Sequence, residues 1–156
     1  MRKTALLPQI RCYYTPETRR WRLRPASQYR QWIQICIERL CLRRLQKIGY
    51  FFIPTSHMSA LHEEFLQDSS ATDVMTFDYG DALEIFIAPA YVALLCKEYG
   101  ETFAEGIRRT MVHGLLHAAG RRDDTPAHEA AMRNEENFYL NLWKEMFHVK
   151  HVGRAV

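Results

Sequence analysis

The chain lacks the features that mark membrane, secreted and low-complexity proteins. Among its 156 residues, no apolar run approaches the roughly 20 residues that a membrane-spanning helix needs. The stretch after Arg2 and Lys3 is too short and too interrupted for a signal peptide. The sequence contains no repeat, linker or biased tract. We therefore expect one cytoplasmic domain over residues 1–156, without a membrane partner.

Cysteine is scarce, and its spacing is not that of a chelate. The four cysteines form no CxxC pair, and Cys36 and Cys41 lie five residues apart in a segment expected to be helical. This spacing argues against both a disulfide scaffold and a cysteine zinc site. We expect all four cysteines to be buried thiols in a reducing compartment.

Charge is divided unevenly along the chain. Residues 1–50 carry twelve Lys and Arg against two acidic residues, a net charge of +10, whereas residues 51–156 carry nine against sixteen, a net charge of −7. The basic half suits contact with a polyanion such as RNA. A solvated helix face with a mobile arm explains the same charges equally well. The acidic half would repel nucleic acid unless a metal or nearby basic residues intervene.

Hydrophobic periodicity predicts the α+β class: one domain with a mixed sheet of about four strands covered by helices. We expect strands at residues 9–14, 50–53, 72–77 and 83–87, with a turn at 79–81 that makes the last two a hairpin. We expect helices from about residue 27 to about 46, then at 56–65, 90–99, 102–119 and 126–147. The element order is therefore β-α-β-α-β-β-α-α-α.

The helix expected at 102–119 carries two histidines four residues apart, His113 and His117. They differ by about 40° around the helix and one turn along it, so both imidazoles can reach one ion. Gly120 can take the left-handed conformation that ends a helix and fold the chain back, which brings Asp123 to the same ion. The pattern H-x3-H-x5-D thus predicts a divalent-metal site, most simply for one Zn²⁺, with an open coordination position.

Alternatives to this site stay open. Two histidines at this spacing also occur on ordinary helix surfaces, and His128 and Asp124 compete with Asp123 as third ligand. A site of two His and one Asp also accepts nickel, manganese or iron. The zinc-protease pattern H-E-x-x-H needs a Glu after the first His, and Gly114 occupies that slot, so a zincin-like helix without protease chemistry is favoured.

Two motifs at their proper separation resemble the YbeY-type family of rRNA-maturation endoribonucleases. Residues 113–123, HGLLHAAGRRD, are similar to the family signature H-G-x-L-H-x-x-G-x-x-H, and residues 71–77, ATDVMTF, are similar to its P-T-D-V-L-S-F strand. The positions of Met132, Glu135 and Glu136 also agree. The chain departs from the family in four places: Asp123 replaces a third His, Arg121 replaces an aromatic, Leu83 replaces a Gly, and Leu66 replaces the arginine associated with RNA processing.

The resemblance implies a single-strand-specific, metal-dependent endoribonuclease that binds ribosomal RNA and the small ribosomal subunit. It would act at the 3′ end of 16S rRNA and in ribosome quality control, with His113 and His117 as catalytic ligands of the metal. We add the hypothesis that Arg109, Arg121 or Arg122 neutralises phosphate charge in place of the missing arginine. Thr72 and Asp73 either satisfy a turn or line the cleft.

Two other functions remain open from the sequence. One is a ribosome-associated assembly factor in which the metal is structural and cleavage is weak or absent, a hypothesis that Leu66 keeps open. The other is a different metal hydrolase, such as a peptidase, against which Gly114 argues.

Overall fold

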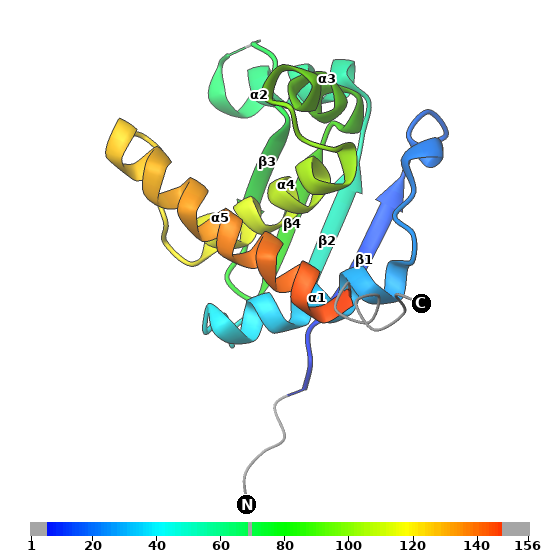
Figure 1. The fold of residues 1–156 in the computed structure, drawn as a ribbon. Coiled ribbons are helices and arrows are strands. Elements are labelled where there is room, and N and C mark those ends of the chain that lie inside the picture. Colours follow the sequence, from blue (N-terminus) through cyan, green and yellow to red (C-terminus); the bar gives the residue numbers. More distant parts are fainter. Residues whose placement is uncertain (1–5, 69, 148–156) are drawn as a thin grey trace, which may run out of the picture.

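A computed structural model of the chain describes residues 6–68 and 70–147. Within these residues four strands and five α-helices follow one another in the order that the sequence predicted, so the α+β class is confirmed (Figure 1). The elements are β1 (Gln9–Tyr14), α1 (Ala26–Arg39), β2 (Lys47–Phe52), α2 (Thr55–Leu66), β3 (Val74–Asp78), β4 (Ala82–Ile87), α3 (Pro89–Tyr99), α4 (Phe103–Ala118) and α5 (Pro126–Phe147), with a short 3₁₀ helix at Arg19–Trp21. No helix in this part of the chain is both long and apolar enough to cross a bilayer.

The sheet is mixed, with strand order β1-β2-β4-β3. Strands β1, β2 and β4 are parallel, and β3 runs antiparallel to β4. The predicted hairpin is confirmed: Tyr79 donates its backbone N–H to the carbonyl of Ala82 over 2.9 Å, and Gly80 takes a φ of 88° in the turn. Strand β3 therefore forms one edge of the sheet, where α4 packs against it and β4.

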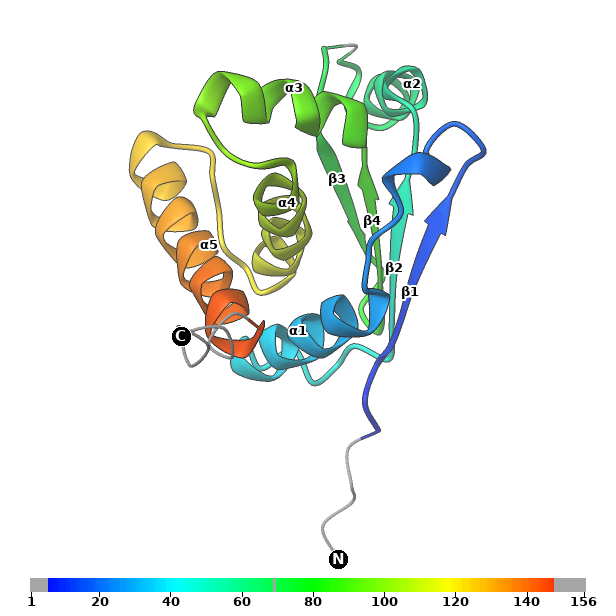
Figure 2. The ribbon, with the colours of Figure 1, turned by 45° about the vertical axis from the view of Figure 1, so that its right-hand side comes forward.

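One face of the sheet carries the main core. Helices α1, α4 and α5 lie together on this side in Figure 2. Side chains alternate along a strand, so Ile48, Tyr50 and Phe52 of β2 all point into this core and are almost fully buried. The opposite face has a smaller cluster around Met58 of α2. The asymmetry places the predicted metal helix α4 in the middle of the larger core.

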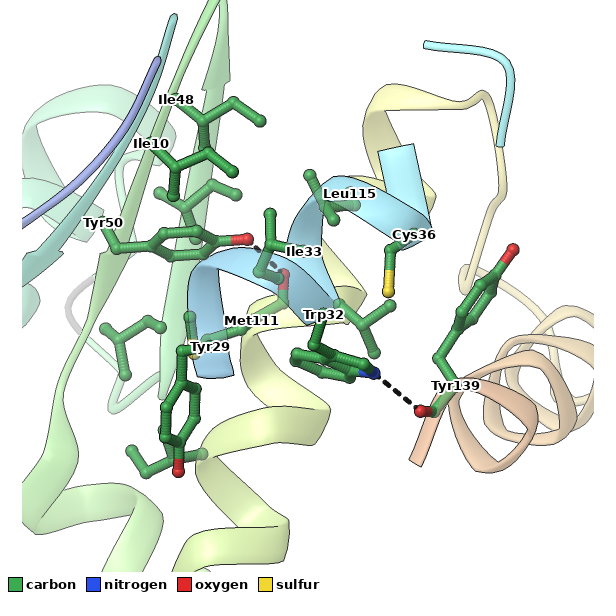
Figure 3. Packing of buried hydrophobic residues seen from close by; sticks show 14 of the residues in the cluster. Ile10, Tyr29, Trp32, Ile33, Cys36, Ile48, Tyr50, Met111, Leu115 and Tyr139 are labelled. Carbon is green, nitrogen blue, oxygen red and sulfur yellow. Dashed lines mark hydrogen bonds between the residues drawn. The ribbon is translucent and has the colours of Figure 1, made fainter. Parts of the chain in front are cut away.

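Two buried hydrogen bonds fix the helices on this face (Figure 3). The hydroxyl of Tyr50 donates to the backbone carbonyl of Met111 in α4 over 3.1 Å. The indole N–H of Trp32 in α1 donates to the carbonyl of Tyr139 in α5 over 2.9 Å. Each bond satisfies a polar group that would be costly to bury unpaired. The bond to Met111 holds the middle of α4 against the sheet, half a turn before His113.

Helix α4 packs closely against the sheet at Gly114. A Cβ atom at this position would lie 2.7 Å from Cδ1 of Ile85 and 3.0 Å from Oγ1 of Thr76. Such distances are too short for a side chain to be added without a shift of its neighbours. The slot that holds the general-base Glu in zinc proteases therefore faces the sheet here, which removes the main basis for a peptidase.

The end of α1 was predicted incorrectly. The helix stops at Arg39 instead of about Gln46, because Cys41 takes a left-handed conformation with a φ of 55°. The N–H of Leu42 then bonds back to the carbonyl of Ile37 over 3.1 Å, as in a Schellman end. The turn directs Leu42 and Leu45 into the core, and their burial stabilises an end that has no Gly or Pro.

The same turn corrects the prediction for the thiols. Cys36 and Cys96 are buried and Cys12 is half-buried, but Cys41 is exposed. All four are free cysteines, so the absence of disulfides among them agrees with the sequence. The exposure of Cys41 follows from its place in the turn after α1 rather than on the inner face of a longer helix.

Candidate metal centre

Helix α4 and the loop after it bring three potential ligands together. Nε2 of His113 lies 3.0 Å from Nε2 of His117. Oδ2 of Asp123 lies 3.4 Å from the former nitrogen and 3.3 Å from the latter. The three groups form a compact triangle in which each can direct one atom at a common point. The structure thus places His113, His117 and Asp123 as the sequence predicted.

The loop that carries Asp123 reverses direction at Gly120. This residue has a φ of 86°, in the left-handed region that glycine adopts without strain. The N–H of Arg121 then donates to the carbonyl of Leu116 over 3.0 Å, and the N–H of Gly120 donates to the carbonyl of His117 over 2.9 Å. These bonds close the end of α4 and turn the chain back, which is how the side chain of Asp123 reaches the two imidazoles.

Each imidazole is oriented by a bond at its other nitrogen. Nδ1 of His113 lies 2.7 Å from Oε2 of Glu136 in α5, and Nδ1 of His117 donates to the carbonyl of Arg121 over 3.1 Å. Acceptors at both Nδ1 atoms place the protons there and leave both Nε2 lone pairs free. Partners of this kind fix the tautomer and direction of histidines that bind metals.

The donor set fits a divalent ion. The two imidazole Nε2 atoms lie 3.0 Å apart with a carboxylate oxygen beside them, so the three groups can share one cation, either a proton or a metal ion. Two His and one carboxylate form a common zinc ligand set that leaves one position open. His113, His117 and Asp123 would therefore hold the metal, and the same set also accepts other first-row ions.

Without a bound ion, the electrostatics of His113 favour a positive charge. Burial disfavours the imidazolium form, but the hydrogen bond and charge of Glu136, together with the charges of Asp123 and Asp73, outweigh it and raise the pKa of His113 above its ordinary value. The carboxylates thus make the position of His113 attractive to a cation. A metal ion satisfies this preference as a proton does.

The rival ligands lie in a separate cluster. Nδ1 of His128 is 2.6 Å from Oδ1 of Asp124, and the other carboxylate oxygen of Asp124 pairs with Arg122. These contacts hold the pKa of Asp124 at about 2, through the bond to His128 first and that to Arg122 second. His128 lies on the first turn of α5, where it is half-buried rather than fully exposed as the sequence predicted. The structure therefore gathers Asp123, and not these two residues, with the histidines.

The three arginines proposed to neutralise phosphate are all paired with carboxylates. Arg109 binds Glu101 over 2.6 Å and Glu136 over 3.2 Å, and its side chain is only 15% exposed. Arg121 binds Glu135 over 2.8 Å, and Arg122 is paired with Asp124 as described above. A direct role for any of them at a phosphate stays a prediction. Arg109 contributes to the site indirectly, because it binds Glu136, the carboxylate that orients His113.

The three ligands open into a cleft of about 1290 Å³ between β3, α4, α5 and the ends of α2 and α3. Thr72 and Asp73 line it, as one of the two sequence hypotheses held. Leu66 also lines it and is 62% exposed, so the position of the family arginine lies at this cleft. Charged residues are mostly acidic there: the lining includes Asp73, Asp78, Glu101, Asp123, Glu129 and Glu136 against Arg109 and Arg133. A cation in the cleft would offset part of this negative charge.

Asp73 is a carboxyl group of the cleft whose charged form is disfavoured by burial. Desolvation raises its pKa above the ordinary value, although its own backbone and the charge of His113 act in the opposite direction. The backbone carbonyl of Asp73 accepts the N–H of Ala88 over 2.9 Å, which holds this residue beside the end of β4. The position thus keeps a poorly solvated carboxyl directed at the site.

Glu136 was absent from the site predicted from the sequence. It is 5% exposed and lies on the buried face of α5, among Met132, Tyr139, Leu140 and Trp143. A carboxylate in an otherwise apolar helical stripe needs a partner, and this was the signal available in the sequence. The partners, His113 and Arg109, belong to another helix, so spacing along the chain did not identify them.

Comparison with known proteins gives one consistent result. A sequence model of a family described as Endoribonuclease YbeY matches residues 17–144. A Flavobacterium psychrophilum protein of that name is 33% identical over 108 residues, which make up 67% of this chain and 74% of that protein. A second, from Cytophaga hutchinsonii, is 26% identical over 137 residues, 85% of this chain and 95% of that protein.

A solved structure shares the fold. The solution structure of a Thermotoga maritima protein superposes with a TM-score of 0.57 and covers 91% of this chain and 93% of its own. Its sequence is 18% identical, so this likeness concerns the fold alone.

Proposed function

Because this chain belongs to the YbeY endoribonuclease family, we propose that it is a metal-dependent endoribonuclease that cleaves single-stranded ribosomal RNA. The observation that carries the proposal is the meeting of His113, His117 and Asp123 at an open cleft, with Nδ1 of each histidine bound elsewhere. Gly114, packed against the sheet, supports RNA rather than peptide as the substrate.

The chemistry divides between the metal and the protein. A divalent ion held by the three ligands would supply Lewis acidity to a phosphodiester oxygen. Glu136 orients the imidazole of His113 through its Nδ1 atom, and Arg109 holds Glu136 in place. Asp73 lines the cleft, and we propose that it exchanges a proton with a group of the substrate. The raised pKa of Asp73 brings it closer to the range in which such exchange is efficient.

The finer role we propose is maturation of the 3′ end of 16S rRNA and ribosome quality control, in contact with the small ribosomal subunit in the cytoplasm. The basic first fifty residues support it, because a net charge of +10 favours association with a polyanion. Arg19, Arg20, Arg22 and Arg24 are all exposed. They offer this charge to RNA outside the acidic cleft.

A cleavage assay tests the proposal. Purified protein, zinc-loaded or metal-stripped, is incubated with single-stranded rRNA and, separately, with casein, beside a His113→Ala variant. We expect cleavage of RNA by the zinc-loaded wild type alone. Casein cleavage, or RNA cleavage that persists in the stripped protein and in the variant, would contradict the proposal.

One observation favours a second candidate, an assembly factor with a structural metal. Leu66, in the position of the family arginine, is an exposed apolar side chain at the cleft and offers no charge to RNA. Binding to the small subunit without cleavage of its RNA, by protein that retains its metal, would support this function instead.

A further inference from the structure

Among the described residues, two arginines line the cleft, Arg109 and Arg133, and they differ in exposure and in their ion pairs. Arg109 is 15% exposed and binds two carboxylates at 2.6 and 3.2 Å. Arg133 is 53% exposed, and its nearest carboxylate, that of Glu101, lies 3.9 Å away, at the limit of an ion pair. A loose pair at an exposed position contributes little to stability. Of the arginines that line the cleft in the described residues, Arg133 is thus the one able to take a new anionic partner.

Arg133 lies next to an exposed aromatic ring. The guanidinium carbon of Arg133, on α5, is 5.9 Å from the centroid of Tyr99, the last residue of α3. The tyrosine side chain also lines the cleft and is 66% exposed. Because most of the Tyr99 side chain is exposed to solvent, its ring is available to stack on a base. A cation beside such a ring is a combination that binds the two parts of a nucleotide, its phosphate and its base.

This pair lies close to the metal ligands. Arg133 precedes Glu136 by three residues on α5, about one helical turn or roughly 5 Å along the axis. Glu136 in turn bonds to His113. Glu101 links the two arginines, since it binds Arg109 over 2.6 Å and approaches Arg133. A strand whose scissile phosphate sits at the metal would therefore bring a neighbouring nucleotide to this end of the cleft.

We propose that Arg133 and Tyr99 form a nucleotide subsite of the cleft, in which Arg133 binds a backbone phosphate and Tyr99 stacks on the adjoining base. The inference rests on the proposed ribonuclease function and specifies how its substrate is held. In this proposal Arg133 makes a phosphate contact that Leu66, which stands in the position of the family arginine, is unable to make.

The experiment measures binding without cleavage. The probe is a short single-stranded 2′-O-methyl oligonucleotide, which lacks the free 2′-hydroxyl and is titrated into zinc-loaded protein by fluorescence anisotropy. Arg133→Gln should weaken binding about tenfold at low salt. Loss of one phosphate contact should also reduce the slope of log affinity against log salt concentration by about 0.7. Arg133→Lys should restore most of the affinity and most of the salt slope, because it keeps the positive charge.

The matched control is Lys144→Gln. Lys144 is another exposed basic residue of α5, but it does not line the cleft within the described chain. We expect the control to leave affinity and salt slope close to wild type. Tyr99→Leu should weaken binding several-fold with an unchanged salt slope, because stacking carries no charge.

Three results would overturn the subsite. One is an Arg133→Gln variant that binds the probe with wild-type affinity and slope, and another is an equal effect of Lys144→Gln. The third is weaker binding that comes with lost metal or a lowered Tm, since this indicates a structural role. Failure of the ribonuclease function is a separate result: the wild type binds the probe in an Arg133-dependent way but does not cleave RNA.

Discussion

Oε2 of Glu136 lies 2.7 Å from Nδ1 of His113, and this contact joins the last helix of the chain to the metal helix. The second oxygen of Glu136 accepts a bond from Arg109 over 3.2 Å. Both partners of the carboxylate are on α4, and Glu136 itself is on α5. The geometry of the metal site therefore depends on the packing of these two helices. A substitution in α5 that disturbs Glu136 should change the affinity of the site for its metal.

Glu136→Gln tests this dependence. The amide keeps the shape of the side chain but removes the charge that orients His113, so we expect metal affinity to fall by about 10–100-fold. Glu135→Gln is the control, because Glu135 is on the same helix but binds only Arg121 among these residues. Competition with a chromophoric chelator measures both. Equal affinities in the two variants would exclude the orienting role.

Asp123→Ala tests the third ligand. It removes a group that lies 3.3–3.4 Å from both imidazole nitrogens, so the loss of affinity should exceed that of Glu136→Gln. Asp123→His should retain the metal, since imidazole is the donor that the family signature has there. In the control Asp124→Ala, zinc content by mass spectrometry of the native protein should stay at one per chain. The ligand assignment is wrong if Asp124→Ala loses the metal and Asp123→Ala keeps it.

Asp73→Asn should stabilise the metal-free protein at neutral pH. Burial raises the pKa of Asp73 in the folded state above its unfolded value, so the folded state holds this proton more tightly. The free energy of unfolding of the wild type therefore decreases as pH rises through the raised pKa, because the buried carboxyl loses its proton and becomes charged. Asparagine has no charge to desolvate, and its advantage should shrink as pH is lowered toward about 4. Urea unfolding at several pH values measures it; an advantage independent of pH would contradict this origin.

The sequence predicted those parts of the site that local geometry determines. His113 and His117 follow from the pitch of one helix, and the return of Asp123 follows from a left-handed turn at Gly120. The strands and the hairpin turn likewise follow from alternation and from a turn of three residues. In each case the interacting residues are close in the chain, so their spacing determines their relation.

The rest depended on contacts between distant elements. Glu136 reaches His113 from a separate helix, and Arg133 meets Tyr99 across two helices. The early end of α1 at Arg39 has the same origin, because the burial of downstream leucines in the core overrides a helical pattern. Such relations are set by tertiary packing, which no periodicity in a single segment encodes.

Reconstitution of activity with a counted amount of metal tests whether RNA cleavage depends on one ion held by His113, His117 and Asp123. Protein stripped by a chelator receives zinc in increasing molar ratio, and cleavage of single-stranded rRNA is followed at each step. We expect activity to rise from background to a plateau at about one ion per chain, and His117→Ala to stay at background throughout. Full activity in stripped protein, or a plateau reached equally by His117→Ala, would contradict this expectation.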